Sequence, residues 1–308
     1  MAFDRKTFII PDKTKFEERM IFTKGDVVIG DRCLISFGIK TDGRIFVGEH
    51  VIIDGDLEAS DDIRADIFSN IGGNIKSGGN VYLGEKVKVK GKLSLNGDLD
   101  VGDSVEIKKG FEAKGWINIR SPIPMVIYIF IYLMQLLKMG HSEEIDRLLA
   151  EIEENEDENT IPISEIFLYI PNNSIIGLQK SRVDSNIHIG KESYIIGNFE
   201  IKGNVIIEDA SSIQGTFKST GNLICGKNIK IEGNIDSNGE VIVDEKTKIA
   251  GNISGSRIFL SKTSNVNGKI TAKQGVSFTN SAEYKAEEKV RRFEKNVDIV
   301  DEVEDMLE

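Results

Sequence analysis

The chain has 308 residues and a formal net charge of −11. An acidic chain lacks the basic surface typical of nucleic-acid-binding proteins, so we expect no nucleic-acid partner. Residues 1–6 show no apolar signal sequence, and Cys33 and Cys225 fall at different repeat positions, which favours free thiols in a reducing compartment. We therefore expect a cytoplasmic protein.

Residues 1–24 are interpreted as an entry segment. Phe8 to Pro11 predicts a short strand that ends at the proline, and Lys13 to Phe22 suits a helical turn.

A regular repeat begins near residue 25 and is clearest between Gly55 and Gly115. A glycine, a polar residue and an apolar residue recur there with an 18-residue step, and a second interleaved set lies six residues on. Apolar residues two apart share one face of a strand, so the step generates columns of like residues. The columns are Ile45, Ile63, Val81, Leu99 and Ile117; Val47, Ala65, Leu83, Val101 and Ile119; Ile39, Leu57, Ile75, Leu93 and Phe111; and Ile53, Ile71, Val89 and Ile107.

Such columns predict a parallel β-solenoid. Each 18-residue turn would contribute three short strands and stack on the turn before it, enclosing a triangular prism of aliphatic side chains. We expect the glycines to supply the corners through positive φ, together with Asn and Asp, which tolerate the left-handed region.

A second array repeats the first at a constant offset of 160 residues. Gly55 corresponds to Gly215 and Gly73 to Gly233, and the entry segments also correspond, Ile10 to Ile170. The chain is thus an internal duplication. Between Gly251 and Gly268 the step is one residue short, which predicts a looser final turn or a bulge.

Residues 122–160 interrupt the repeat with a helical insert and an acidic linker. Met125 to Leu137 is almost wholly apolar; helix is expected, although the alternating pattern at 127–132 also suits a strand. Thirteen residues are too few for a membrane span. The segment would therefore pack on the chain's own solenoid or a second copy, or contact a membrane surface, with insertion into the membrane as the third alternative. The candidate self-association or membrane-contact residues are Ile127, Ile129, Phe130, Ile131, Leu133 and Leu136.

Two amphipathic helices are expected outside the arrays. Ser142 to Glu154 carries one apolar face, and residues 283–308 form a charged C-terminal helix with a thin stripe that includes Phe293, Val297 and Leu307. Both helices would cap open solenoid ends or mediate self-association. The predicted domains are 1–24, 25–121 (first solenoid), 122–160, 161–282 (second solenoid with its entry segment) and 283–308.

The sequence contains few residues that suggest catalysis or the binding of a ligand. No metal-ligand, phosphate-loop or nucleophile motif occurs, and His50, His141 and His188 have no neighbour in sequence that suggests a catalytic triad. We therefore predict no catalytic, cofactor or metal residues, no cofactor and no small-molecule substrate. Lys86, Lys88, Lys90 and Lys92 form a short basic stripe that is either solvated or meets an acidic partner, such as the acidic tail of another copy.

The paired triplets, as in Gly197-Asn-Phe-Glu-Ile-Lys-Gly203-Asn-Val, resemble the bactofilins, a polymer-forming cytoskeletal family. The resemblance covers residues 25–120 and 185–280. It implies a right-handed triangular β-helix, cytoplasmic filaments that form without nucleotide by end-to-end stacking, a scaffolding role often at membranes, and no active site. The doubled array and its flanking helices depart from the family's usual single solenoid.

Two enzyme classes are alternatives. A hexapeptide-repeat acyltransferase also builds triangular prisms, but its strands carry one large inward residue, and it needs a general-base histidine between subunits. A carbohydrate-active β-helix wants longer, irregular turns. The sequence therefore favours a mainly β, non-enzymatic structural protein that binds copies of itself, with peripheral membrane contact left open.

Overall fold

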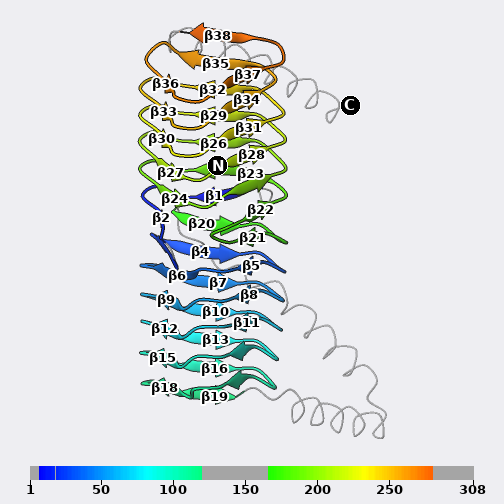
Figure 1. The fold of residues 1–308 in the computed structure, drawn as a ribbon. Helices are drawn as coiled ribbons and strands as arrows, with labels where there is room; N and C mark the ends of the chain where they lie inside the picture. The colour runs from blue at the N-terminus through cyan, green and yellow to red at the C-terminus, as the bar shows by residue number, and fades with distance from the viewer. Residues whose placement is uncertain (1–6, 18, 120–165, 280–308) are drawn as a thin grey trace, which may run out of the picture. The chain divides into compact units, whose positions relative to one another are not determined.

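A computed structural model describes residues 7–17, 19–119 and 166–279 (Figure 1). These residues contain short β-strands and no helix, and the chain divides into two compact units. The first unit holds the described residues of 23–172, and the second those of 1–22 and 173–308. The predicted helical insert, the candidate contact residues of the apolar segment and the C-terminal helix lie outside the described residues.

The first unit is built from three parallel sheets (Figure 1). The first sheet contains β4 (Asp26–Ile29), β7 (Ile45–Val47), β10 (Ile63–Ala65), β13 (Val81–Leu83), β16 (Leu99–Val101) and β19 (Ile117–Ile119). The second contains β5 (Leu34–Ile35), β8 (Ile52–Ile53), β11 (Asn70–Ile71), β14 (Lys88–Val89) and β17 (Glu106–Ile107). The third contains β6 (Gly38–Thr41), β9 (Leu57–Ala59), β12 (Ile75–Ser77), β15 (Leu93–Leu95) and β18 (Phe111–Ala113).

The predicted columns are confirmed as registered pairs. Ile63 pairs with Ile45 and with Val81, and the other three columns pair in the same way. Away from the ends these side chains are buried: Ile63, Val81 and Leu93 are each 0% exposed. The parallel β-solenoid with 18-residue turns is therefore correct, with its core inside the three sheets.

The second unit repeats this plan. One sheet contains β1 (Thr7–Ile10), β23 (Asn186–Ile189), β26 (Val205–Ile207), β29 (Leu223–Cys225), β32 (Val241–Val243), β35 (Ile258–Ser261) and β38 (Val276–Thr279). Another contains β21 (Ile175–Ile176), β22 (Ser181–Val183), β25 (Phe199–Ile201), β28 (Phe217–Ser219), β31 (Ile235–Ser237), β34 (Ile253–Gly255) and β37 (Ile270–Ala272). The third contains β2 (Lys15–Phe16), β24 (Tyr194–Ile196), β27 (Ser212–Gln214), β30 (Lys230–Ile231), β33 (Lys248–Ile249) and β36 (Asn265–Val266).

Two expectations about these turns are corrected. The described residues of 13–22 form no helical turn, because β2 and β3 (Met20–Thr23) pair antiparallel there, Lys15 with Phe22 and Phe16 with Ile21. The short step near Gly251 is not a bulge. Val241 pairs with Ile258, a 17-residue step, because the corner before β35 holds only Ser256 and Arg257, one residue fewer than the corner before.

Each entry strand pairs with the array that lies farther from it in the sequence. β1 pairs with β23 of the second array, and β20 (Phe167–Ile170) pairs with β4 of the first. The two joints are alike: Gly190 N–H donates to Ile10 O and Gly30 N–H to Ile170 O, both at 2.7 Å. Each entry strand thus completes the array that belongs to the other copy of the repeat, an arrangement that the sequence analysis did not foresee.

A ladder of side-chain oxygens explains the glycine–asparagine motif. Asn80 N–H donates to Asp62 Oδ1 at 2.6 Å, and Asp98 N–H donates to Asn80 Oδ1 at 2.8 Å. Each oxygen also lies beside the glycine of the next turn, so a Cβ at Gly97 would overlap Asn80 Oδ1 and the Gly79 backbone. These glycines are needed for space, and the prediction that they act through positive φ is wrong for them.

The left-handed corner is made by other residue types. In the first unit Arg32, His50, Phe68, Lys86 and Ser104 have φ between 55° and 59°, at 18-residue intervals. In the second unit Ala210 and Lys246 occupy the same corner, with φ of 60° and 58°. Left-handed φ costs a non-glycine residue about 1–2 kcal/mol, so the stacked turns must stabilise the corner repeatedly.

Candidate self-association surfaces

The last described turn of the first unit leaves its core open. Leu99 and Val101 in β16 are 1% and 9% exposed, whereas Ile117 and Ile119, the same column positions in β19, are 49% and 72% exposed. The side chains are of the same chemical kind, so the difference arises because no later turn within the described residues covers β19.

The same turn also exposes aromatic side chains and strand edges. Phe111 in β18 is 50% exposed although its partner Leu93 is 0% exposed, and Trp116 is 85% exposed. Trp116 N–H donates to Asp98 Oδ1 at 2.7 Å, so the polar ladder holds the backbone of this turn in place. Among the described residues, β17, β18 and β19 pair with other strands on one side only. We call Phe111, Trp116, Ile117 and Ile119 the first open end.

The last described turn of the second unit resembles it. Phe278 in β38 is 65% exposed, whereas Leu260, its partner in β35, is 3% exposed. Val276 is 39% exposed against 0% for its partner Ile258. Val276 and Phe278 are the second open end. Both arrays therefore finish on apolar side chains where the repeat stops.

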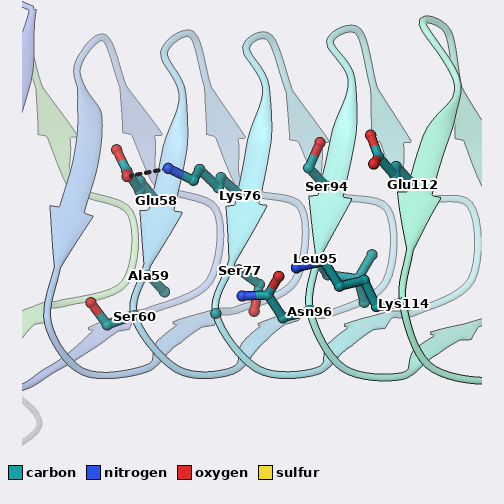
Figure 2. Close-up of a pocket in the computed structure, with 11 residues that line it drawn as sticks. Glu58, Ala59, Ser60, Lys76, Ser77, Ser94, Leu95, Asn96, Glu112 and Lys114 are labelled. Atoms are coloured by element: carbon teal, nitrogen blue, oxygen red, sulfur yellow. Dashed lines mark hydrogen bonds and ion pairs between the residues drawn. The ribbon is translucent and has the colours of Figure 1, made fainter.

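The outer face of the third sheet of the first unit carries lysines and glutamates that form ion pairs with one another. Glu58 accepts from Lys76 of the next turn at 3.1 Å (Figure 2). It also accepts from Lys40 of the turn before at 3.0 Å. Hydrogen bonds from Lys40, then from Lys76, lower the pKa of Glu58. The shallow groove beside them, of about 400 Å³, is lined by side chains such as Ser94, Glu112 and Lys114. A carboxylate held ionised between two ammonium groups is not suited to general acid catalysis.

The predicted basic stripe is partly paired. Lys88 lies 3.0 Å from Glu106, and Lys92 lies 2.8 Å from Glu112. Lys86 instead places its Nζ 4.8 Å from the ring centroid of Phe68. The paired lysines favour the interpretation of the stripe as a solvated face.

The described histidines lie on outer faces and do not come together. His50 stacks on Phe68 with ring centroids 4.9 Å apart and an interplanar angle of 3°. His188 places Nε2 2.8 Å from Glu208, a carboxylate one turn later, so the prediction that it has no suggestive partner missed a contact that spans turns. His141 lies outside the described residues.

Both cysteines are buried, and neither is part of a disulfide. Burial raises the pKa of Cys225 to about 12, which removes its nucleophilic form near neutral pH. Within the described ranges, no three histidine, cysteine or acidic side chains gather in a metal-binding arrangement.

Sequence reasoning missed the two open ends. Ile117, Ile119 and Phe111 belong to columns that were assigned to the core, and the sequence signal for their exposure is simply that the column stops. The candidate residues Ile127 to Leu136 come after β19 in sequence but lie outside the described residues. The structure therefore does not test them.

No helix within the described part of the chain has the length and apolar character to cross a membrane.

Neither the curated proteins nor the solved structures contain a match to the chain. One family model does match, over residues 205–298, and it covers most of the second array. The matched family is Bactofilin, which is described as polymer-forming cytoskeletal.

Proposed function

We propose that this protein is a non-enzymatic cytoskeletal scaffold of the bactofilin type, and that it self-associates end to end through its open solenoid turns. The observation that carries the proposal is the exposure of Ile117 and Ile119, whose column equivalents one turn earlier are buried. The matched family supports polymer formation.

The open end suits another solenoid turn better than a small ligand. It combines apolar side chains with strand edges that pair with no further described strand, and such edges are templates for strand addition. Burying a large apolar side chain stabilises a contact by about 1.5–3 kcal/mol. The side chains of the first open end would together offset a large part of the association entropy, which is about 4–15 kcal/mol. We propose a second copy as the occupant.

The number of open ends decides whether copies of the chain form dimers or polymers. A chain that joins copies at one end stops at a dimer when the contact is isologous, whereas a chain with two competent ends continues to grow. The ends are chemically separate, because one contains Ile117 and Ile119 and the other Phe278.

The test uses charged substitutions at each end and light scattering with negative-stain microscopy. We expect Ile117→Glu with Ile119→Glu to reduce polymers to dimers, and the further change Phe278→Glu to give monomers. The matched control is Asn118→Glu, in the same strand but between the two core positions. Wild-type protein that stays monomeric at high concentration would overturn the proposal.

The apolar segment Met125 to Leu137 is proposed as a second contact, with its own copy or with a membrane surface. Residues Ile127, Ile129 and Leu133 would carry it. Deletion of residues 123–140 is expected to change polymer length if the segment joins copies, and to abolish flotation with anionic lipid vesicles if it contacts membranes. Unchanged behaviour in both assays would exclude the segment as a contact.

The non-enzymatic and cytoplasmic assignments remain part of this proposal. Calorimetric binding of acetyl-CoA would contradict the first and favour the acyltransferase alternative. Fractionation of cells that express the full chain would test the second.

A further inference from the structure

The second unit carries a column of apolar side chains on the outer side of its first sheet. The residues on either side of Ile224 in β29, Leu223 and Cys225, are 0% exposed. Because side chains alternate along a strand, the middle residue faces outward. The middle residues of β26, β29, β32 and β35 pair in register, and we call them the outer apolar column: Ile206, Ile224, Ile242 and Phe259.

The equivalent column of the first unit is not apolar throughout. Under the duplication, its residues are Phe46, Arg64, Tyr82 and Asp100. The outward column of β25, β28 and β31 in the second unit is charged in every turn, with Glu200, Lys218 and Asp236. The fold therefore accepts charge at outward positions, and four successive apolar residues are not a requirement of the solenoid. Aligned apolar side chains on an otherwise polar surface mark a contact site.

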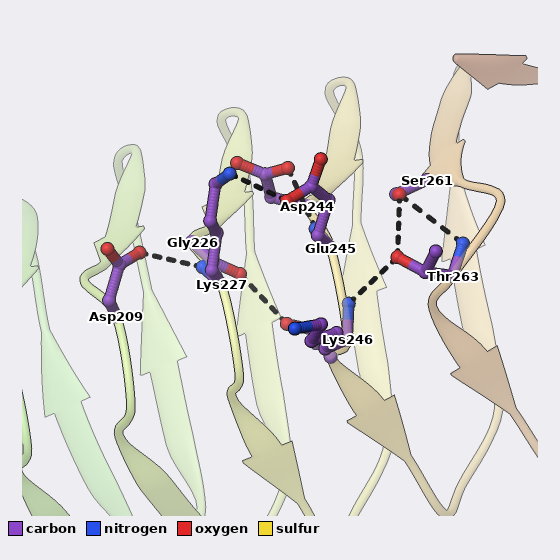
Figure 3. Close-up of polar contacts among 9 residues, drawn as sticks. Asp209, Gly226, Lys227, Asp244, Glu245, Lys246, Ser261 and Thr263 are labelled. Carbon is purple, nitrogen blue, oxygen red and sulfur yellow. Dashed lines mark hydrogen bonds and ion pairs between the residues drawn. The ribbon is translucent and has the colours of Figure 1, made fainter. Parts of the chain in front are cut away.

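A column of alternating charge borders the outer apolar column. The corner after each of the four strands carries one charged residue, and in chain order these are Asp209, Lys227, Glu245 and Lys262. Lys227 lies in the middle of this corner (Figure 3). Its Nζ donates to Glu245 Oε2 at 2.7 Å, and its N–H donates to Asp209 Oδ1 at 2.7 Å. The sign of the side-chain charge therefore reverses at every turn.

We propose that the outer apolar column is a lateral contact with a second copy of this chain, whose second unit lies antiparallel to the first copy's. A two-fold axis would pass between β29 and β32, along the strand direction. Each strand then faces a different strand of the partner, β29 facing β32 and β26 facing β35. Ile224 packs on the partner's Ile242, and Ile206 packs on the partner's Phe259.

The same axis matches the bordering charges. It brings the corner after the strands onto the same corner of the partner, in reverse order of turns. Lys227 then faces the partner's Glu245, and Asp209 faces the partner's Lys262. Because the charges alternate over four turns, reversal places opposite signs together in each of them, and such complementarity fixes the register of a contact.

A parallel pair of solenoids does not fit these charges. Its two-fold axis would run along the solenoid, so each strand would face its own copy with the two corners interchanged. Glu240 precedes β32 and Asp244 follows it, and the parallel pair sets each against the other across the contact. Like charges that face each other oppose association. The charge pattern therefore favours the antiparallel pair.

One such contact is small. Ile206, at 41%, is the most exposed member of the column. Even aromatic side chains bury only about 150–250 Å² each, whereas stable interfaces bury at least about 1,200 Å² in total. Separate chains should therefore pair weakly. Chains joined end to end present the contact repeatedly, and linked contacts bind far more tightly than single ones. In this respect the inference rests on the proposed function: the contact would gather filaments into bundles.

The experiment cross-links two single-cysteine variants of the full chain, His188→Cys and Ser277→Cys, with a short bismaleimide. The two positions continue the column at its ends, in β23 and β38. They are five strand steps apart within one chain, about 24 Å, but face each other in the antiparallel pair. The native Cys33 and Cys225 are buried and do not compete. We expect the mixture to give a covalent dimer joined between 188 and 277, identified by mass spectrometry, and each variant alone to give little.

Substitutions in the column test its part in the contact. Ile224→Arg in both proteins should lower the dimer yield about tenfold or more, because each copy loses apolar burial. The solenoid tolerates arginine at the equivalent position 64, and circular dichroism checks the fold. Lys218→Ser, on another face, should leave the yield unchanged. Lys227→Glu should lower the yield, and Lys227→Glu with Glu245→Lys should restore it, since the reversed pair is again complementary.

Three outcomes overturn the inference: no dimer joined between 188 and 277, dimers of Ser277→Cys alone in equal yield, or a yield that Ile224→Arg leaves unchanged. Microscopy separates the inference from the proposed function. Ile224→Arg should leave filaments of normal length that no longer lie in bundles, whereas Ile117→Glu with Ile119→Glu should shorten the polymers and keep the cross-link. A cross-link from a chain that forms no polymer would support the lateral contact and contradict end-to-end assembly.

Discussion

Leu99 and Ile117 are registered partners in neighbouring strands, yet the first is 1% exposed and the second 49% exposed. The repeat places an apolar side chain at this position in every turn, and nothing in the column itself marks its end. An array built this way stops where the repeat stops, and it stops on a surface with the chemistry of its own interior.

The pairing of each entry strand with the distant array predicts that a substitution in an entry strand destabilises that distant array and not the array next to it in sequence. Phe8 and Leu168 occupy equivalent positions in β1 and β20, and both are 0% exposed. Phe8→Ala should destabilise by about 3–5 kcal/mol and Leu168→Ala by about 2–5 kcal/mol. Hydrogen exchange should show reduced protection at residues 186–207 for Phe8→Ala, although Phe8 lies next to the first array in sequence. Leu168→Ala should affect residues 26–47 instead. Reduced protection of the sequence-adjacent array in both variants would contradict the exchange.

The glycines beside the ladder of side-chain oxygens are tightly packed, and this predicts that adding a single methyl group there lowers the stability. Gly97→Ala should destabilise the first unit by about 1–3 kcal/mol, because the new Cβ would overlap both Asn80 Oδ1 and the Gly79 backbone. The control is Gly110→Asn, where φ is +74° and no atom of the described residues lies within 4 Å of the added Cβ. Asparagine tolerates that φ, so this variant should change the midpoint of urea unfolding little. Equal midpoints for the two variants would show that space is not the constraint.

The left-handed corner predicts that a glycine will stabilise the protein. Ala210 has φ of 60° and an exposed side chain. Ala210→Gly should raise the free energy of unfolding by about 0.5–1 kcal/mol, since relief of the left-handed strain exceeds the added chain entropy of the unfolded state. Ala250→Gly, at an exposed site without positive φ, should lower it by a similar amount. The sign of the difference in thermal midpoints checks the prediction.

The buried thiol of Cys225 predicts an alkaline loss of stability. Burial raises its pKa from 9.0 to about 12, so the folded state keeps the proton that the unfolded state loses. A raised folded pKa gives stability that is complete below pH 9 and declines as pH rises toward 12. The slope from this group is at most about 1.4 kcal/mol per pH unit. Cys225→Ala, which places the residue found at the equivalent position 65, should show a shallower decline in urea unfolding. Identical slopes for the two proteins would refute the assignment.

The periodic part of this fold is readable from the sequence because one side-chain position corresponds to one place in every turn. The columns through Ile63 and Leu93 are correct residue by residue for that reason. The role of the glycines was misjudged, because the sequence does not show that Asn80 Oδ1 occupies the space beside Gly97. That contact joins turns and depends on the stacking.

The pairing of the entry strands and the exposure of the open ends could not be predicted from the sequence, for a different reason. Under the offset of 160 residues, β4 and β23 are equivalent, so the pattern at Phe8 is compatible with pairing to either. The exposure of Ile117 depends on whether another turn stacks on β19 and not on the residue itself. The apolar candidates at Ile127 to Leu136 remain a prediction.

The crossed pairing of β1 and β20 also sets an order in time. Neither array can be completed from its own continuous stretch of chain, because β4, which pairs with β7 on one side, gains its partner on the other side only after residues 167–170 have been made. β1 waits still longer, until residues 186–189 emerge, which at about 5–20 residues per second takes roughly 10–40 seconds of synthesis. During that interval the growing chain carries an unpaired apolar strand at its beginning. Both arrays therefore gain their entry strands only after more than half of the chain has been made. A truncated product from early termination would present β1, and one edge of β4, to whatever strands are nearby.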